Sequence, residues 1–417
     1  MPVSVNFKKY SPLDLFLMMF ILMYYGRLSV VLFIPQYAID YGIPSPYYSL
    51  HFAMVSVGSA LSNVLSILLL RKIDVKKLFL AIGTISAGYE ILLYLYPTPE
   101  TLIVSGLLIG LAAGSFWSMT FLMVCEIIDA HKVQTTEAFS KYNVITTIMG
   151  AVTPLLAGYT VYQFGYGVWL MTALVFLIAA TIFMYFLKDP VYYKTYGRYP
   201  IKEDLSKVIK NKYSFMTFML TMLLSTLTIS TWGSLSRVFF VNVGIRDYWL
   251  GIMALVTSIV TVAVYYVLAR RRVSTRKVLA TLGIVVFGIE LLLITFTSDP
   301  VIVFILEGIV GTAGVAAIGF STQNILKNTF RERVYIGRPL FALGMHVANS
   351  VWFAMCGMII SFYGGYAAVG SILGVQVDQF GLRVLLIILA VIVFLWAIMM
   401  WKHEKEMVKE PESSAIS

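Results

Sequence analysis

Apolar blocks of about 20 residues, separated by short polar turns, run through nearly the whole of this 417-residue sequence. A block of that length matches a bilayer core of ~30 Å, spanned by a helix that rises ~1.5 Å per residue. The composition agrees, because 59% of the residues are hydrophobic and 12% are charged, whereas a soluble domain has about 25% charged residues. The sequence therefore predicts an all-α membrane protein.

Helix lengths and turn residues predict about twelve spans. We expect them at 13–36, 47–70, 78–96, 101–127, 136–161, 166–187, 213–243, 248–269, 278–297, 300–326, 338–363 and 382–401. With this division, 27 Lys and Arg residues fall on one side of the membrane and only Arg246 and Arg383 on the other, while Arg27 and Arg237 lie within spans. Basic loops stay in the cytoplasm, so the pattern predicts a multi-pass protein of the cell membrane with both termini cytoplasmic.

Two sequence blocks recur in the two halves of the chain. Residues 76–93 and 276–293 match at a constant offset, which aligns Gly83 with Gly283, Gly88 with Gly288 and Glu90 with Glu290. Gln163-Phe164-Gly165 likewise recurs as Gln379-Phe380-Gly381. Duplicated helix bundles are a common plan of transporters, with the solute site between the halves. We therefore expect an N-terminal six-helix bundle at 1–187, a cytoplasmic linker loop at 188–212, a C-terminal six-helix bundle at 213–401 and a cytoplasmic tail at 402–417. The Gly-rich stretch 364–381 is expected to be a packed or re-entrant outer loop.

Several motifs resemble those of the major facilitator superfamily. The fifth predicted span carries Gly150-x-x-x-Pro154-x-x-x-Gly158, a Phe164-Gly165 turn with Trp169 follows it, and Gly110 and Gly114 resemble the small-residue pattern of the fourth helix. The loop between the second and third spans retains only Lys76 and Lys77 of the family's longer motif, and Gly106 stands where proton-linked exporters often have Arg. The resemblance implies two six-helix pseudo-repeats of major facilitator type.

A weaker resemblance points to the organophosphate:phosphate antiporters within that superfamily. Tyr24-Tyr25-Gly26-Arg27 followed by Pro35, and Ser140-x-x-Asn143 with Pro154, are similar to the first and fifth helices of those proteins. Their fifth-helix His corresponds to Thr146, and their seventh-helix Arg would fall near Thr231 rather than at Arg237. These departures weaken the assignment to that subfamily.

The function predicted from these features is secondary active transport by alternating access. The solute would be small and organic, with Arg27 favouring an anion, and transport would be driven by a proton or counter-solute gradient. The sequence shows no Walker-type motif, no metal-ligand spacing and no clustered catalytic set. We therefore expect no enzyme activity, no cofactor and no metal, and the partners would be a small-molecule substrate and the lipid bilayer, without nucleic acid, for what is expected to be a monomer. A lipid flippase or lipid-modifying enzyme on the same scaffold is the alternative, and a transport-derived sensor is a third reading.

Arg27 is the most informative single residue. It lies well inside the first span, where a charged group is costly by ~2.5–3.5 kcal/mol, and its guanidinium could bind a carboxylate or phosphate of the substrate. The structural alternative is a salt bridge to an acid such as Glu307. Polar and aromatic residues of the presumed cavity helices complete the predicted substrate site: Tyr24, Tyr25, Trp117, Asn143, Trp232, Gln323 and Asn349.

Titratable residues inside the spans are the candidates for proton coupling. Glu307 and His346 lie on helices that line the path in the resembled fold, and the repeated pair Glu90 and Glu290 serves either as a proton relay or as shared scaffold. At the cytoplasmic ends we expect a gate in which Glu126 and Asp129 pair with Arg71 and Arg331 in one conformation only. Arg237 is expected to reach the outer interface, where its charge would be hydrated.

Overall fold

The computed structural model is almost entirely helical. It describes residues 11–44, 46–70, 72–133, 135–193, 219, 223–224, 226–269, 273–319, 334–365 and 368–407. Within these ranges, eight helical segments are long and apolar enough to cross a membrane. The prediction of an all-α, multi-pass membrane protein is therefore confirmed.

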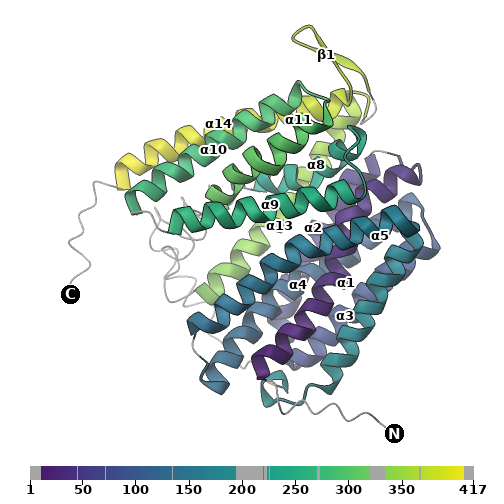
Figure 1. Cartoon of the computed structure of the whole chain (residues 1–417), viewed down its shortest axis with the longest axis vertical. Helices are drawn as coiled ribbons and strands as arrows, with labels where there is room; N and C mark the ends of the chain where they lie inside the picture. The colour runs from purple at the N-terminus through teal and green to yellow at the C-terminus, as the bar shows by residue number, and fades with distance from the viewer. Residues whose placement is uncertain are drawn as a thin grey trace. The chain divides into compact units, whose positions relative to one another are not determined.

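The described helices follow one another in chain order, as the colours of Figure 1 show. In the first part they are α1 (Pro12–Asp40), α2 (Pro46–Leu69), α3 (Val75–Leu95), α4 (Pro99–His131), α5 (Thr135–Phe186) and the short η2 (Pro190–Tyr193). In the second part they are η3 (Thr226–Ser230), α8 (Thr231–Asn242), α9 (Tyr248–Ala269), α10 (Val273–Thr295), α11 (Pro300–Ile305), η4 (Leu306–Gly311), α13 (Val334–Phe362) and α14 (Phe380–Met407). Pro12, Pro99 and Pro300 stand at the first positions of their helices, where a missing N–H costs nothing.

The contacts divide the chain into two compact units. Unit 1 comprises Met1–Glu203, Arg246–Leu255 and Pro339–Gly357, and unit 2 comprises Asp204–Ile245, Val256–Arg338 and Met358–Ser417. The first residues of α9 and most of α13 thus group with the first unit. Most of the predicted linker loop and of the tail lies outside the described residues.

Small residues hold the helices of unit 1 together. A Cβ added to Gly110 of α4 would collide with the carbonyl oxygen of Val55 in α2, and one added to Gly114 would come within 2.5 Å of the carbonyl oxygen of Ser59. Between α1 and α5, Gly26 leaves room for the side chain of Leu177. This is the close backbone approach by which small residues stabilise membrane helix pairs.

Helix α5 is long enough to cross the membrane twice and is broken at Gly165. The break has φ 78° and ψ −179°, a conformation open essentially only to glycine. Lys141 lies near Asp14 and Gly158 near Phe33, so the first arm runs alongside α1. The indole of Trp169 then donates to the carbonyl of Ser29, and Leu177 lies at Gly26, so the second arm runs back in the opposite direction. The two predicted spans, 136–161 and 166–187, correspond to these arms.

The two copies of the repeated block occupy similar places in their own units. α3 packs against α4 and against the second arm of α5, and α10 packs against η4 and against α14. Glu90 and Glu290 are both buried, with 1% and 0% of their surface exposed. The repeat therefore places one buried carboxyl group in the core of each unit.

Residues 364–381 contain a β-hairpin rather than only a packed loop. Strand β1 (Gly370–Ile372) pairs antiparallel with β2 (Val375–Val377), with Ser371 opposite Gln376. Leu373 and Gly374 both have positive φ, 50° and 84°, as a two-residue hairpin turn of type I′ requires. The apolar, Gly-rich composition did not reveal this hairpin, because its turn has none of the Asn or Asp residues usual at the first position.

Candidate functional site

Arg27 lies in the interior of unit 1, where the sequence predicts a functional charge. Its guanidinium carbon lies 4.3 Å from the centre of the Phe116 ring in α4, a distance suited to a cation–π interaction. Its charge also interacts with that of Glu90 in α3. Neither oxygen of Glu90 accepts a hydrogen bond from any described residue, and the Arg27 Nε atom is also without an acceptor.

Aromatic side chains of three helices gather on one side of Arg27. The rings of Phe20 and Phe116 are stacked 5.6 Å apart, and Tyr24 meets Trp117 edge to face at 5.8 Å. Tyr142 of α5 completes the group, 5.3 Å from Phe20. Tyr25 points elsewhere and packs 4.3 Å from Phe176. Tyr24 and Trp117 thus lie in the same group of rings as Phe116, on which Arg27 packs, and we call these rings with Arg27 the aromatic cluster.

The other predicted polar residues of unit 1 are more scattered. Asn143 lies on an exposed face of α5, and Asn349 of α13 is buried with its Oδ1 atom lacking a donor. His346 is partly buried and lies three residues before Asn349, about one turn away along α13. Gln323, the remaining predicted substrate residue, lies outside the described residues.

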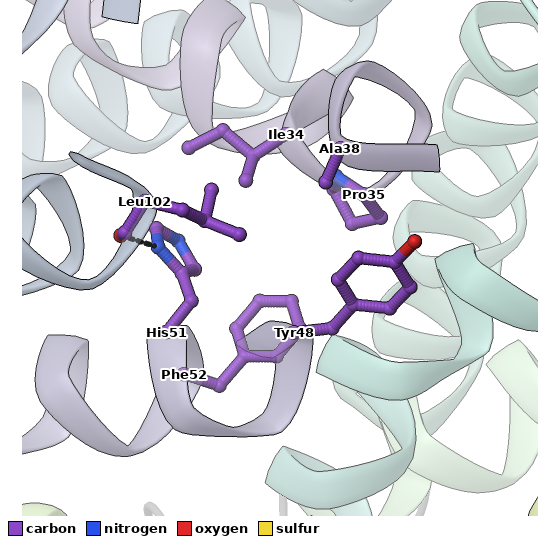
Figure 2. Close-up of a pocket in the computed structure, with 7 residues that line it drawn as sticks. All are labelled: Ile34, Pro35, Ala38, Tyr48, His51, Phe52 and Leu102. Carbon is purple, nitrogen blue, oxygen red and sulfur yellow. Dashed lines mark hydrogen bonds between the residues drawn. The ribbon is translucent and has the colours of Figure 1, made fainter. Parts of the chain in front are cut away.

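His51, which was not among the predicted site residues, lines a small pocket (Figure 2). Its Nδ1 atom lies 2.7 Å from the carbonyl oxygen of Leu102 and must donate to it, because a carbonyl only accepts. The rest of the lining is apolar or aromatic: Ile34, Pro35, Ala38, Tyr48, Phe52 and the Leu102 side chain. The space is too narrow to admit water. The pocket is therefore a packing feature of α1, α2 and α4.

Unit 2 has its own buried charged group, formed where two π-helical turns occur. The indole Nε1 of Trp232 donates to Glu307 Oε2 across 2.6 Å. Trp232 follows directly after the π-helix η3, and Glu307 lies inside the π-helix η4. π-helical turns are rare and occur mostly at functional sites.

Glu290 of α10 and Arg237 of α8 complete this group. The Glu290 carboxyl packs on Gly311, where an added Cβ would come within 2.8 Å of it, and Glu307 lies in the same π-helix η4 as Gly311. The charge of Arg237 interacts with Glu307. We call Trp232, Arg237, Glu290 and Glu307 the acid-pair cluster. Sequence reasoning placed Arg237 at the outer interface and missed this arrangement. The signal was that Arg237, like Arg27, is a charged residue inside the first predicted span of its half.

The predicted cytoplasmic gate is only partly described. Glu126 is buried and Asp129 is exposed at the end of α4, while Arg71 and Arg331 lie outside the described residues. His131, in the last turn of α4, pairs instead with Asp189, its Nε2 atom lying 2.9 Å from the carboxylate. The nearby Lys76 is buried and donates to the carbonyl oxygens of Tyr185 and Leu187, 2.8 and 2.7 Å away. This lysine anchors the end of α5.

An ionic group lies at the opposite end of unit 1. Arg246 pairs with Asp40, whose second oxygen accepts a hydrogen bond from Tyr166 at 2.5 Å, and Gln36 donates to Asp247 at 2.5 Å. Burial by itself lowers the pKa of Arg246, but the hydrogen bond and charge of Asp40 outweigh it and raise that pKa. Arg246 is therefore firmly cationic here.

Comparison with known proteins gives these features a family context. The sequence profile of the Major Facilitator Superfamily matches residues 15–337. The chain belongs to the major facilitator superfamily. Among curated proteins, none matches this chain in sequence.

Solved structures of the superfamily share the fold. A mutant of the nucleoside transporter NupG superimposes with a TM-score of 0.72 at 14% identity, covering 93% of this chain and 99% of that one. The unmutated nucleoside transporter NupG gives a TM-score of 0.70 at 14% identity, covering 96% of this chain and 99% of that one. At this identity the likeness concerns the fold. Membership of the superfamily places this chain in a family of membrane transporters.

Proposed function

We propose that this superfamily member is a secondary active transporter that moves a small organic solute by alternating access of two six-helix halves. The halves would be 1–187 and 213–401, giving twelve spans in two pseudo-repeats, with 188–212 as the linker loop and 402–417 as the tail. The observation that carries the proposal is the burial of charged groups within spanning helices, Arg27 with Glu90 and Arg237 with Glu307. Such groups are expensive in a bilayer and mark solute or ion pathways.

The orientation follows from the distribution of basic residues. Both termini would lie in the cytoplasm. The protein would be located in the cell membrane as a monomer. The family membership supports the transmembrane placement, and the ratio of 27 to 2 basic residues on the two sides supports the direction.

The aromatic cluster is the proposed place of solute contact in unit 1. Aromatic faces with a few polar groups are usual in small-molecule sites, and Tyr24, Trp117 and Arg27 supply both kinds of group. An anionic solute would take the guanidinium of Arg27 as its partner. Because flat aromatic faces dominate the cluster, the arrangement equally suits a neutral solute with a flat ring. We propose five further residues as solute contacts along the transport path: Tyr25, Asn143, Trp232, Gln323 and Asn349.

The cytoplasmic gate remains part of the proposal. Glu126 and Asp129 would pair with Arg71 and Arg331 when the inner side closes, and an ion pair made in one conformer only shifts the balance between conformers. Coupling is proposed to a proton or counter-solute gradient, through Glu307, Glu290, Glu90 or His346.

A solute panel tests both substrate class and function. Purified protein is heated with neutral nucleosides, organic phosphates and organic carboxylates in turn. A solute at 100 times its Kd stabilises the folded protein by about 2.7 kcal/mol. The solute that raises the melting temperature is then followed into proteoliposomes. We expect saturable uptake that Arg27→Ala lowers at least tenfold, whereas Lys77→Ala, an exposed cation of the same unit, leaves uptake as it was.

Two results would contradict the proposal. Uptake of the stabilising solute that is unchanged in Arg27→Ala removes Arg27 from the site. Movement of fluorescent lipid between leaflets, with no solute uptake from any class of the panel, would make the protein a flippase instead.

A further inference from the structure

The acid-pair cluster of unit 2 contains more negative than positive groups. Arg237 is its single cation among the described residues, and Glu290 and Glu307 are its acids. If every group were ionised, the cluster would carry one net negative charge in the interior of the membrane. The corresponding group of unit 1, Arg27 with Glu90, is balanced when both are ionised. Only the second unit therefore needs an additional cation to become neutral.

The surroundings of Glu290 indicate that the additional cation is a proton. The side chain is fully buried, and no N–H or O–H group of the described residues donates to either of its oxygens. Its carboxyl group packs against η4, the π-helical turn that also contains Glu307. An ionised carboxylate only accepts hydrogen bonds and is very costly to bury without a donor, so two acids this deep in one unit require a proton on one of them.

The remaining contacts indicate which acid is ionised. Glu307 accepts a hydrogen bond from Trp232 and interacts with the charge of Arg237, and both favour its carboxylate form. Glu290 has Gly311 and apolar groups beside it, and α14, which packs on α10, presents Val393 and Phe394 at the neighbouring Gly288. No other ionisable side chain occurs in 384–401 of α14 or in 226–230 of η3.

From this arrangement we propose that Glu290 and Glu307 hold one proton between them, as a carboxylic acid donating to a carboxylate, and that this pair is the proton-binding site of the transporter. The inference deepens the proposed function, on which its transport role rests. In each cycle the pair takes one proton from the side to which it is open and releases one to the other side, with no other bond formed or broken. Glu290 carries the proton, Glu307 accepts its hydrogen bond, and Trp232 and Arg237 position Glu307.

The π-helical turns supply a physical means of exposing the pair. In η4 the hydroxyl of Thr312 donates to the carbonyl oxygen of Glu307 across 2.9 Å. The hydrogen bonds of this π-helical turn therefore depart from the regular α-helical pattern. A helix segment with irregular hydrogen bonding shifts its register more readily than a regular one. A shift at η4 would move Glu307 relative to Glu290 and open the shared proton to water.

Infrared spectroscopy of the purified protein tests the proton without any solute. A protonated carboxyl group has a C=O stretching band distinct from that of a carboxylate. We expect one buried carboxyl band at neutral pH in the unmodified protein, absent in Glu290→Gln and in Glu307→Gln. The band should persist in Glu90→Gln, the repeat counterpart in unit 1, and in Glu100→Gln, which removes an exposed acid of α4. Persistence of the band in Glu290→Gln, or its loss in Glu90→Gln alone, would overturn the assignment.

Transport coupling is measured separately in proteoliposomes loaded with a pH-sensitive dye. With the solute identified by the panel, the unmodified protein should accumulate it against its gradient when the outside is acidic. Glu290→Gln should retain solute exchange but lose this accumulation, and the melting temperature of each variant shows whether it folds. Unchanged accumulation in a folded Glu290→Gln variant contradicts the coupling role. Absence of uptake in the unmodified protein contradicts the proposed function instead, while the infrared result still decides on the proton.

Discussion

Arg383 offers a sharp test of how this protein uses charge at the edge of its spanning helices. It lies in the first turn of α14 with 0% of its side chain exposed. Its NH1 group donates to the carbonyl oxygens of Ile294 and Thr295 at the end of α10, 3.0 and 2.8 Å away. Its other nitrogens bind Asp378 and Ser298. Arg246, by contrast, has 41% of its side chain exposed in its pair with Asp40.

The expected cost of Arg383→Ala follows from these contacts. The carbonyl of Ile294 would keep the amide of Thr297 as a donor, but those of Thr295 and Thr297, which Arg383 also bonds, would lose theirs. Each buried carbonyl left without a donor costs about 1–3 kcal/mol, and removing one partner of a buried ion pair costs about 3–5 kcal/mol. Asp378 is 43% exposed, so water would hydrate it in the variant and the carbonyls would account for most of the loss. We expect a decrease of about 3–5 kcal/mol in the free energy of unfolding. Arg246→Ala should cost only about 0.2–1 kcal/mol, as exposed pairs do.

Reversible unfolding in mixed detergent micelles, followed by the helical circular dichroism signal, gives both values under the same conditions. Arg383→Lys serves as the intermediate variant, because it keeps the charge but not the forked set of donors. The reasoning is refuted if Arg383→Ala and Arg246→Ala cost the same, or if Arg383→Lys is as stable as the unmodified protein.

Two further predictions concern packing and pH. Gly110→Ala should destabilise the protein by about 1–3 kcal/mol, because the added Cβ would collide with the backbone of Val55. Gly88→Ala, whose added Cβ has nothing within 4 Å, should instead stabilise the protein by up to ~1 kcal/mol through helix propensity. Equal effects of the two variants in the same unfolding assay would contradict the packing argument. Burial raises the pKa of Asp378, but hydrogen bonds from Ser298 and Arg383 and the charge of Arg383 outweigh it, so this pKa lies below its ordinary value of 3.8. The stability that Asp378 contributes is therefore present above pH 3.8 and is lost as pH falls through the lower folded value; Asp378→Asn should remove this part of the acid dependence, and parallel unfolding curves for the two proteins between pH 5 and 3 would disprove it.

The helical segments were predictable because bilayer length and hydropathy constrain them directly. The break at Gly165 was also predictable, since its motif recurs near Gln379 and falls between two span-length blocks. The repeat identified Glu90 and Glu290 as equivalent before any coordinates were known, and both are buried at similar places in their units. These features depend on the local sequence and on the lipid environment, which the hydropathy of the sequence indicates.

The partners of the charged residues could not be predicted. Arg27 was considered for a bond to Glu307; within its own unit the structure places its guanidinium over the Phe116 ring of α4, and within unit 2 Glu307 accepts from Trp232. Arg237 reaches Glu307 because the π-helical turns at 226–230 and 306–311 change which face of each helix a side chain occupies. No hydrophobic period reveals such a turn, since one additional residue in a uniformly apolar helix leaves no pattern to read. For the same reason the Glu290–Glu307 pair emerged only from the coordinates.

The reversal at Gly165 fixes on which face of the bilayer the remainder of the chain begins. Were residues 141–186 a single straight helix, they would extend ~69 Å at ~1.5 Å per residue, more than twice the hydrocarbon thickness. The fold-back returns residue 186 to the level of residue 141, so everything after it starts from the same compartment. The side of the membrane from which more than half of the polypeptide continues thus depends on a single residue without a side chain.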